Sequence, residues 1–458
     1  MPEKRPAGSA QVTHKDVLAI ALPIIASNIS TPLIGIVDTA VLGQLPGAHH
    51  IGGVALGATI FTFLFWAFGF LRMGTTGLTA QAFGADNKGE VGAALERALG
   101  IALVAGILLI LFHWPLKSLA LGFAEGSRAV ENETADYFDI RIWSAPAALA
   151  NYCLVGWFIG LQRARTALAL QIFLNGLNAG LDALFVLEFG WGVAGVAWGT
   201  LIAEVAAAVV GLVIASRIVD RSFAFPALKQ IRDPEQLNRA LSVNSDIMIR
   251  TLALLAAFSW FTIQSAPAGD ATLAANAVLM QLVGFSAHLL DGFAFAAETL
   301  VGAAVGAKAK DRFRRAVWLS SIWAALIAIA ISAILWLTGG LMIDVLTVNV
   351  DVRQFARDAL PYAALMPAIG VAAYQLDGIF IGTTRTADMR NMMVVSSAAF
   401  FMTWHLAVPV LGNDGRWISL LALNIVRAGL LFWRYPALLA DAFPTQAAAR
   451  PNAPLADR

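Results

Sequence analysis

The chain has 458 residues, of which 59% are hydrophobic and 13% are charged, and its mean hydropathy is +0.71. Soluble domains carry about 25% charged residues, so this composition excludes a disordered chain and an ordinary soluble enzyme, and a single cysteine excludes a disulfide scaffold. A balance of 31 Lys and Arg against 30 Asp and Glu gives no electrostatic basis for a nucleic-acid partner. These properties are typical of a multi-pass membrane protein.

Apolar runs long enough to cross a bilayer follow one another along the chain. A hydrocarbon core of about 30 Å needs roughly 20 mainly apolar helical residues, and continuous Leu- and Ala-rich runs favour helices over the short alternating strands of a barrel. We therefore predict an all-α integral membrane fold with twelve transmembrane helices. They are predicted at residues 16–44, 52–83, 92–122, 134–160, 167–188, 193–217, 240–265, 272–306, 316–346, 353–382, 391–411 and 416–440.

Lys and Arg gather in every second loop between the predicted spans. The loops after the second, fourth, sixth, eighth and tenth spans carry them, whereas the short opposite loops LPGAHHIGG, EFGWG and SAPAGD carry none. Because positively charged loops stay on the cytoplasmic side, both termini are predicted to be cytoplasmic and the chain to lie in the cell inner membrane. The polar N-terminus precedes an apolar run that is too long for a cleavable signal peptide.

The two halves of the chain repeat each other at one offset. The fourth span ends GWFIGLQR and the tenth ends GIFIGTTR, which places Gly160 222 residues before Gly382. The second and eighth spans agree, with Gly84 222 residues before Gly306. Six spans per half give both halves the same orientation, so two pseudo-symmetric six-helix lobes and alternating access by lobe rocking are expected. The predicted organisation is a cytoplasmic N-terminal tail (1–13), an N-lobe (14–217), a cytoplasmic linker (218–238), a C-lobe (239–440) and a cytoplasmic C-terminal tail (441–458).

The N-lobe carries polar residues inside its predicted spans. Asp38 lies in the first span and Thr200 in the sixth, and Asn175, Asn178 and Asp182 share one face of the fifth because of their spacing. An ionisable group at mid-bilayer costs about 2.5–3.5 kcal/mol. Amides and hydroxyls alone fit a structural role as hydrogen bonds between helices, but two aspartates do not. The five residues are therefore predicted to form a site that couples transport to a cation or proton.

The second lobe lacks this group, because the positions equivalent to Asn178 and Asp182 hold Phe400 and Trp404. Coupling is therefore expected in the N-lobe alone. The acids of the second lobe are predicted either to line a substrate cavity or to have a structural role. These are Asp291, Glu298 and Asp377.

Other charges and two prolines receive simpler interpretations. Asp246 and Arg250 are spaced to neutralise each other on one helix. Three residues placed nearer span ends are expected to extend their charged heads toward the interface. They are Arg72, Glu204 and Arg427.

The first span is interrupted by Pro23 and Pro32. Proline removes a backbone hydrogen bond and bends a helix. Pro23 is therefore either a static kink or a conformational hinge.

Four stretches resemble the multidrug and toxic compound extrusion (MATE) family, and specifically its DinF-type branch, over about residues 14–440. They are VDTAVLGQL, GFLRMGTTGLTAQAFGADN, NGLNAGLDALF and YQLDGIFIGTTRTADMRN. The resemblance implies the family's twelve spans and two lobes, with Asp38 as the main coupling carboxylate and Asn178, Asp182 and Thr200 completing the N-lobe site.

The same resemblance gives Pro23 the place of the proline that bends the first helix in related transporters. Asp377 matches an acid of the tenth span in relatives that couple through the second lobe. The buried Glu that those relatives carry in the seventh span is missing here.

The function implied is a secondary active multidrug efflux antiporter that exports amphipathic or cationic drugs and toxic metabolites and so confers drug resistance. Two close carboxylates in a low-dielectric interior can share a proton, while the oxygens of Asp38, Asn178, Asp182 and Thr200 could instead ligate Na⁺. The DinF resemblance favours H⁺. We expect no cofactor beyond this coupling ion, no nucleic-acid partner, contact with membrane lipids, and a monomer.

The sequence leaves two other functions to compare with efflux. A lipid-linked oligosaccharide or lipid flippase of the same superfamily would need cationic cavity residues, whereas the membrane-embedded charges look mainly acidic. A membrane enzyme is disfavoured because the chain carries no HExxH or GxSxG motif in the context these motifs need, and an enzyme has no need of duplicated lobes.

Overall fold

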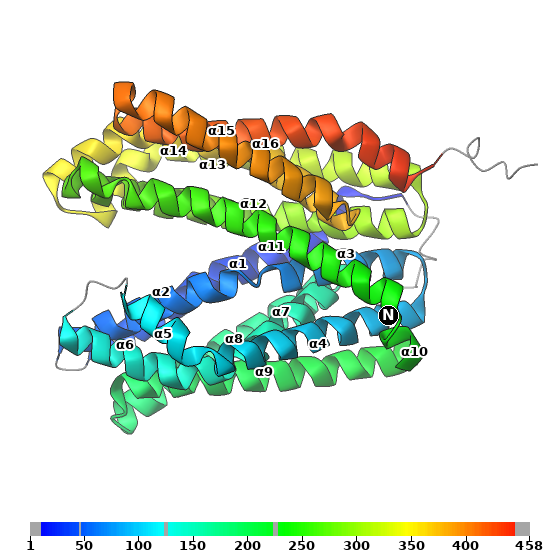
Figure 1. Ribbon diagram of the computed structural model, residues 1–458, viewed down its shortest axis with the longest axis horizontal. Helices are drawn as coiled ribbons and strands as arrows, with labels where there is room; N and C mark the ends of the chain where they lie inside the picture. The colour runs from blue at the N-terminus through cyan, green and yellow to red at the C-terminus, as the bar shows by residue number, and fades with distance from the viewer. Residues whose placement is uncertain (1–10, 45–46, 123–126, 223–227, 445–458) are drawn as a thin grey trace, which may run out of the picture.

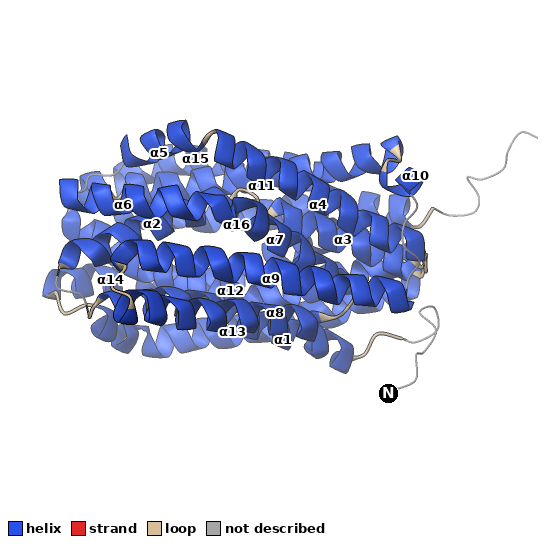
Figure 2. Ribbon diagram, turned by 90° about the horizontal axis from the view of Figure 1, so that it is seen from below, coloured by secondary structure: helices blue, strands red, loops and turns tan. Residues whose placement is uncertain are grey.

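The computed structural model describes residues 11–44, 47–122, 127–222 and 228–444. Over these ranges the regular secondary structure is helical, with no strand (Figure 2). Eleven segments of the described chain are long and apolar enough to cross a membrane, and the 29-residue α1 coincides with the first predicted span. The predicted all-α fold of twelve membrane helices is confirmed.

The first half of the chain forms one bundle, here called the N-terminal bundle. The second and fourth predicted spans are each built from two helices, α2 with α3 and α6 with α7. The third predicted run is divided at Phe112, where α4 ends and α5 starts. The helices are α1 (His14–Leu42), α2 (Ala48–Trp66), α3 (Phe70–Gly84), α4 (Lys88–Leu111), α5 (His113–Gly122), α6 (Arg128–Arg141), α7 (Ala145–Gly160), α8 (Ala164–Ala183) and α9 (Gly192–Ser222).

The second half forms the C-terminal bundle, which lies beside the first with its helices along the same long axis (Figure 1). A short helix, α10 (Leu228–Ile231), precedes it. Its six helices are α11 (Pro234–Ile263), α12 (Asp270–Gly306), α13 (Lys310–Leu346), α14 (Val350–Gly382), α15 (Thr386–Leu411) and α16 (Asn413–Ala442).

Helices occupy both ends of the predicted linker 218–238. Helix α9 continues to Ser222, and α11 begins at Pro234 with Asp233 as its N-terminal cap. Residues 223–227 of that linker, most of the N-terminal tail and most of the C-terminal tail lie outside the described residues.

The packing of the two bundles repeats the offset of 222 residues. Gly156 lets α7 approach the backbone of α3 at Arg72, and Gly378 lets α14 approach the backbone of α12 at Ala294; a Cβ at either glycine would collide with the carbonyl oxygen. Arg72 and Ala294 are themselves 222 residues apart. The two-lobe pseudo-symmetry read from small residues is thus present as equivalent helix contacts, because only glycine permits such close packing.

The bundles meet through α1 and α3. Helix α1 packs against α8 in its own bundle and against α12 in the other, and α3 packs against α11, α12 and α14. At one end of the molecule the contact is reciprocal: Gly84 faces the backbone of Ala303, and Gly306 faces the backbone of Gln81. A contact in which each partner repeats the other's role is typical of a two-fold axis.

Candidate functional site

The predicted N-lobe residues converge from three helices. Asp38 comes from α1, Asn178 and Asp182 from α8, and Thr200 from α9. Asn178 Nδ2 donates to Thr200 Oγ1 at 3.1 Å, and Thr200 Oγ1 donates to the carbonyl of Val196 at 2.9 Å. The structure therefore brings residues of the first, fifth and sixth predicted spans together in one cluster.

Asp38 and Asp182 form the centre of this cluster. Asp38 is 7% exposed and Asp182 is 0% exposed, and their carboxyl groups are near enough to interact directly. Among the described residues, no donor reaches Asp38 Oδ1 or either carboxylate oxygen of Asp182. Gly199 of α9 leaves no room for a Cβ beside Asp182 Oδ1, so this carboxylate packs directly against α9. Two buried acids in contact, with three of their four carboxylate oxygens reaching no described donor, form an unstable arrangement when both are charged.

Asn175 lies on the same face of α8 but has partners of its own. Its Nδ2 donates to the carbonyl and to Oγ of Ser30, at 3.1 and 3.0 Å. Gln171 Nε2 donates to its Oδ1 at 2.8 Å. Asn175 therefore ties α8 to α1 two turns from Asp182.

A buried ion pair beside the cluster was missed by the sequence analysis. Arg141 of α6 binds Glu204 of α9, with 3.1 Å between Nη2 and Oε1, and donates to the hydroxyl of Tyr137 at 3.1 Å. Its charge also acts on Asp38 and Asp182. The interpretation of Glu204 as an interfacial residue is wrong, because it is buried and paired. The signal that could have found the pair was an arginine inside the fourth predicted span.

Helix α1 is continuous through Pro23, which is half-buried. Close by, Gly292 of α12 packs against the backbone of Ala21 and the side chain of Ile25. Pro23 therefore lies where α1 contacts the opposite bundle. The side chain of Pro32 lies outside the described residues.

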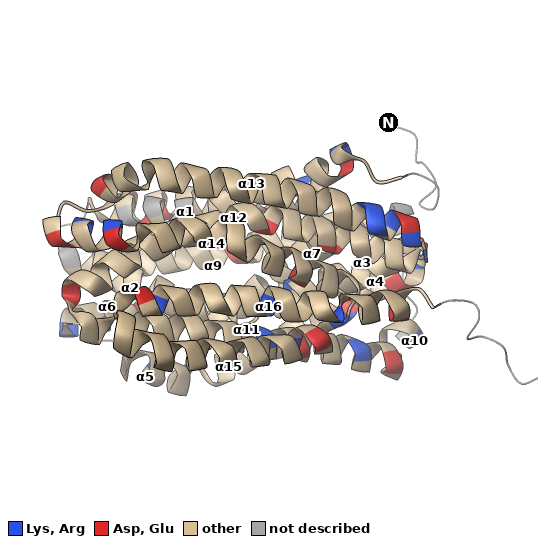
Figure 3. Ribbon diagram, turned by 90° about the horizontal axis from the view of Figure 1, so that it is seen from above, with Lys and Arg blue, Asp and Glu red and all other residues tan. Residues whose placement is uncertain are grey.

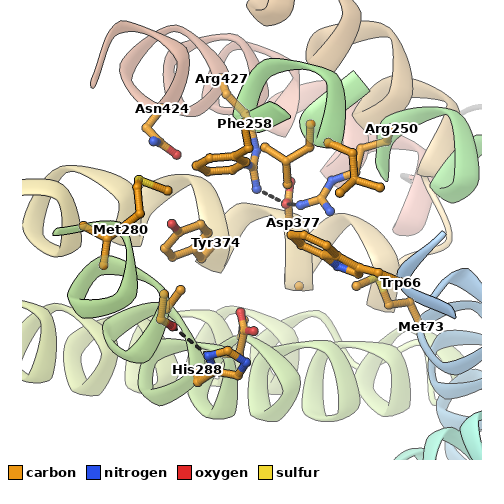
Figure 4. A pocket seen from close by; sticks show the side chains of 18 of the residues that line it. Trp66, Met73, Arg250, Phe258, Met280, His288, Tyr374, Asp377, Asn424 and Arg427 are labelled. Carbon is orange, nitrogen blue, oxygen red and sulfur yellow. Dashed lines mark hydrogen bonds and ion pairs between the residues drawn. The ribbon is translucent and has the colours of Figure 1, made fainter. Parts of the chain in front are cut away.

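A cavity of about 560 Å³ lies between the bundles (Figure 4). Helices α11, α12, α14 and α16 supply most of its wall, and the N-terminal bundle adds Phe63, Trp66 and Met73. The volume is within the range of drug-sized ligand sites, which are also mainly apolar and aromatic. All three acids predicted for a cavity line it, namely Asp291, Glu298 and Asp377.

Two arginines hold Asp377. Arg250 of α11 and Arg427 of α16 both donate to its Oδ2, and both line the cavity (Figure 4). Arg427 is 1% exposed and lies near the middle of α16, so its interpretation as an interfacial residue is wrong.

The expected pairing of Arg250 with Asp246 is wrong as well. Asp246 instead accepts from Arg390 Nη1 at 2.5 Å and from Thr386 Oγ1 at 2.9 Å at the start of α15.

The acids of α12 face a third arginine. The guanidinium of Arg72 lies 3.7 Å from the ring centroid of Phe295, and its charge acts on Glu298 and Asp291. Arg72 is therefore not an interfacial residue either. Glu298 is 0% exposed, and no described donor reaches its carboxylate oxygens. Three acids and two arginines therefore line the cavity, and Arg72 lies beside two of the acids.

Comparison with known proteins gives consistent matches. A family model described as MatE matches residues 23–184 and 247–403. The chain is 40% identical over 430 residues to DNA damage-inducible protein F of Escherichia coli, which covers 92% of each chain. It is 24% identical to the probable multidrug resistance protein NorM of Caulobacter vibrioides, over 96% of this chain and 94% of that protein. A crystal structure of MATE in the bent conformation superposes with a TM-score of 0.84 at 19% identity, covering 94% and 97% of the two chains.

Proposed function

Because the chain belongs to the MatE family, we propose that it is a secondary active antiporter that exports amphipathic small molecules across the cell inner membrane in exchange for protons. Membership makes the chain an efflux transporter that crosses the membrane many times, so the resemblance drawn from the sequence and the expectation of a transporter rather than an enzyme are confirmed. Proton coupling, the substrates and the inner-membrane location are the proposal.

The buried pair of Asp38 and Asp182 is the observation that carries proton coupling. When both carboxylates are charged they repel each other, and Asp38 Oδ1 and both oxygens of Asp182 reach no described donor. One proton removes the repulsion and supplies the missing hydrogen bond between the two side chains. The pair therefore favours holding one proton when α1 lies close to α8, and favours separation when it holds none.

Movement of α1 offers a path from this proton to the substrate. The helix contacts α8 on one side and α12, which lines the cavity, on the other. We propose that protonation draws α1 toward α8 and α9, with Pro23 as the hinge, and so reshapes the site from which substrate leaves. Only a few kcal/mol are needed to shift such an equilibrium.

Contacts at one end of the molecule support alternating access. Gln81 of α3 donates to the carbonyl of Gly382 at 2.9 Å, and Arg239 of α11 donates to Gln81 Oε1 at 2.6 Å. Together with the reciprocal contacts of Gly84 and Gly306, they close the bundles against each other. Basic residues are frequent at this end, where α1 begins and α16 ends (Figure 3), which supports its assignment to the cytoplasmic side. The conformation described is then closed to the cytoplasm.

Sodium is the alternative coupling ion, at Asp38, Asn178, Asp182 and Thr200. Asn178 Oδ1 also has no described donor, so several oxygens of the cluster could turn to a cation. A single protein chain holds the whole cluster and the whole cavity, which supports a working monomer surrounded by lipid.

A lipid or lipid-linked oligosaccharide flippase is kept as a second candidate because Arg250 and Arg427 line the cavity. The three acids that line the same cavity oppose a pyrophosphate, which carries several negative charges.

Transport in proteoliposomes tests the proposal. Purified protein is reconstituted with a fluorescent amphipathic drug, and either a pH gradient or a sodium gradient is imposed. We expect the pH gradient alone to drive drug movement. Strict dependence on sodium at constant pH would replace the proton by sodium, and movement of lipid-linked oligosaccharide without drug transport would favour the flippase.

A further inference from the structure

One wall of the cavity between the bundles, formed by α11, α14 and α16, carries more positive than negative charge. Arg250 and Arg427 share one carboxylate, Asp377, and both bind the same oxygen of it. When all three are ionised, this Asp377 cluster has a net charge of +1. Its own acid therefore leaves one guanidinium charge unbalanced, in an interior where that is costly.

The arginines also have unused donors. Arg427 uses Nη2 on Asp377, but its Nε and Nη1 are buried and reach no described acceptor, and the same holds for Arg250 Nε. A guanidinium offers five N–H donors in a fixed planar fork that matches a carboxylate or a similar anion. Buried donors that reach no acceptor in the protein favour an acceptor brought by a ligand.

The surroundings of the cluster are suited to an amphipathic molecule. Tyr374 places its ring centroid 5.7 Å from the guanidinium carbon of Arg427, and Phe258 and Met280 lie beside it in the cavity (Figure 4). Trp66 of the N-terminal bundle adds a second aromatic wall. An apolar body can thus pack against rings while one polar end reaches the arginines.

The wall of the cavity formed by α12 carries a net negative charge. Asp291 and Glu298 of α12 lie near Arg72, and these three residues have a net charge of −1 when all are ionised. Arg250 and His288 also act on Asp291. The field across the cavity therefore orients a bound acid away from α12 and toward α11, α14 and α16.

We propose that the Asp377 cluster binds the acidic group, a carboxylate or sulfonate, of an amphipathic substrate. This inference rests on the proposed function only in taking the cavity as the substrate site. The acidic group lies beside Asp377 and accepts hydrogen bonds from Arg427 and Arg250, and the apolar body extends along Phe258 and Met280.

Fluorescence titration of the purified protein in detergent tests this site. The probe is 11-(dansylamino)undecanoic acid, and the control ligand is its methyl ester, which has the same body without the charge. Wild-type protein is expected to bind the acid about 10- to 100-fold more tightly than the ester, the range for a hydrogen bond to a charged group. Equal affinity for acid and ester would overturn the proposal without any variant.

The variant Arg427→Gln tests whether the acid probe binds at the Asp377 cluster. It leaves Arg250 to neutralise Asp377, so we expect the affinity for the acid to fall about 10- to 100-fold while that for the ester is unchanged. Arg416→Gln is the matched control, since Arg416 is a buried arginine of the same helix that does not line the cavity, and it should change neither affinity. Parallel loss of both affinities in Arg427→Gln would contradict the assignment.

Competition separates a free amphipathic acid from a phospholipid. Dodecanoate is expected to displace the probe more effectively than a lysophosphatidate with the same chain length. Stronger displacement by the lysophosphatidate would show that the site binds a lipid phosphate, and the proposal would be wrong. Binding in detergent needs no ion gradient, so a failure of this site and a failure of proton-driven export are distinguishable.

Discussion

The two bundles share a framework of helix contacts but bury their acids in opposite ways. In the N-terminal bundle, Asp38 and Asp182 face each other without a described donor on Asp182. In the C-terminal bundle, Asp377 is bound by two arginines. Two guanidinium groups compensate the charge of one carboxylate, whereas two carboxylates in contact gain stability from a proton. The bundles therefore repeat one set of glycine contacts around two different sites, one that we propose binds protons and one that we propose binds charged substrates.

The largest expected effect is the loss of coupling in the N-terminal bundle. Asp38→Asn and Asp182→Asn each remove a group that the shared proton needs, so gradient-driven export should fall to the level of empty liposomes. Asp139→Asn, which changes an exposed acid of α6 paired with Lys117 at 2.7 Å, is the control and should transport normally. Wild-type export from either cluster variant, at equal protein content, would remove that residue from the mechanism.

A large effect is also expected where the bundles close on each other. Gly84→Val places a side chain against the backbone of Ala303, so the two bundles cannot meet at this end and export should nearly cease. Gly100→Val in α4 is a matched control, because a Cβ there meets nothing within 4 Å. Labelling of a cysteine introduced at Thr384 should become faster in Gly84→Val; an unchanged labelling rate with normal export would contradict the proposed closure.

Asp377→Asn should lower the stability of the fold without abolishing proton coupling. It leaves two buried arginines without their shared carboxylate, which typically costs about 3–5 kcal/mol of folding free energy. The protein that folds should still couple to protons but with altered affinity and substrate range. Thermal unfolding in detergent and transport after reconstitution check the two parts. Loss of coupling equal to that of Asp182→Asn would show that the bundles are not specialised as argued.

The smallest expected effect is that of Pro23→Ala. An alanine restores a backbone donor and straightens the hinge, so export should weaken severalfold while the carboxyl pair still exchanges its proton. Initial export rates at matched expression measure this. An unimpaired variant would remove the hinge and leave rocking of the bundles as the simpler mechanism.

The sequence predicted the spans well because the length of an apolar run is a local property, and each run became one helix or two consecutive helices. The N-lobe cluster could also be predicted from the sequence, because residues 175, 178 and 182 share a helical face whatever that helix packs against. The acidic partners of Arg427, Arg141 and Arg250 could not be predicted from the sequence. They belong to other helices, and their pairing depends on which helix faces meet in the folded bundle. Local spacing suggested a pair between Asp246 and Arg250, and tertiary packing separated them.

Infrared difference spectroscopy of the purified protein tests the central claim most directly, because a protonated carboxyl group has a band that a carboxylate lacks. We predict one such band in wild-type protein, which disappears as the pH is raised and does not respond to sodium at constant pH. The band should be absent from both Asp38→Asn and Asp182→Asn and should persist in Asp377→Asn. A band that sodium displaces, or one lost only in Asp377→Asn, would contradict a shared proton on Asp38 and Asp182.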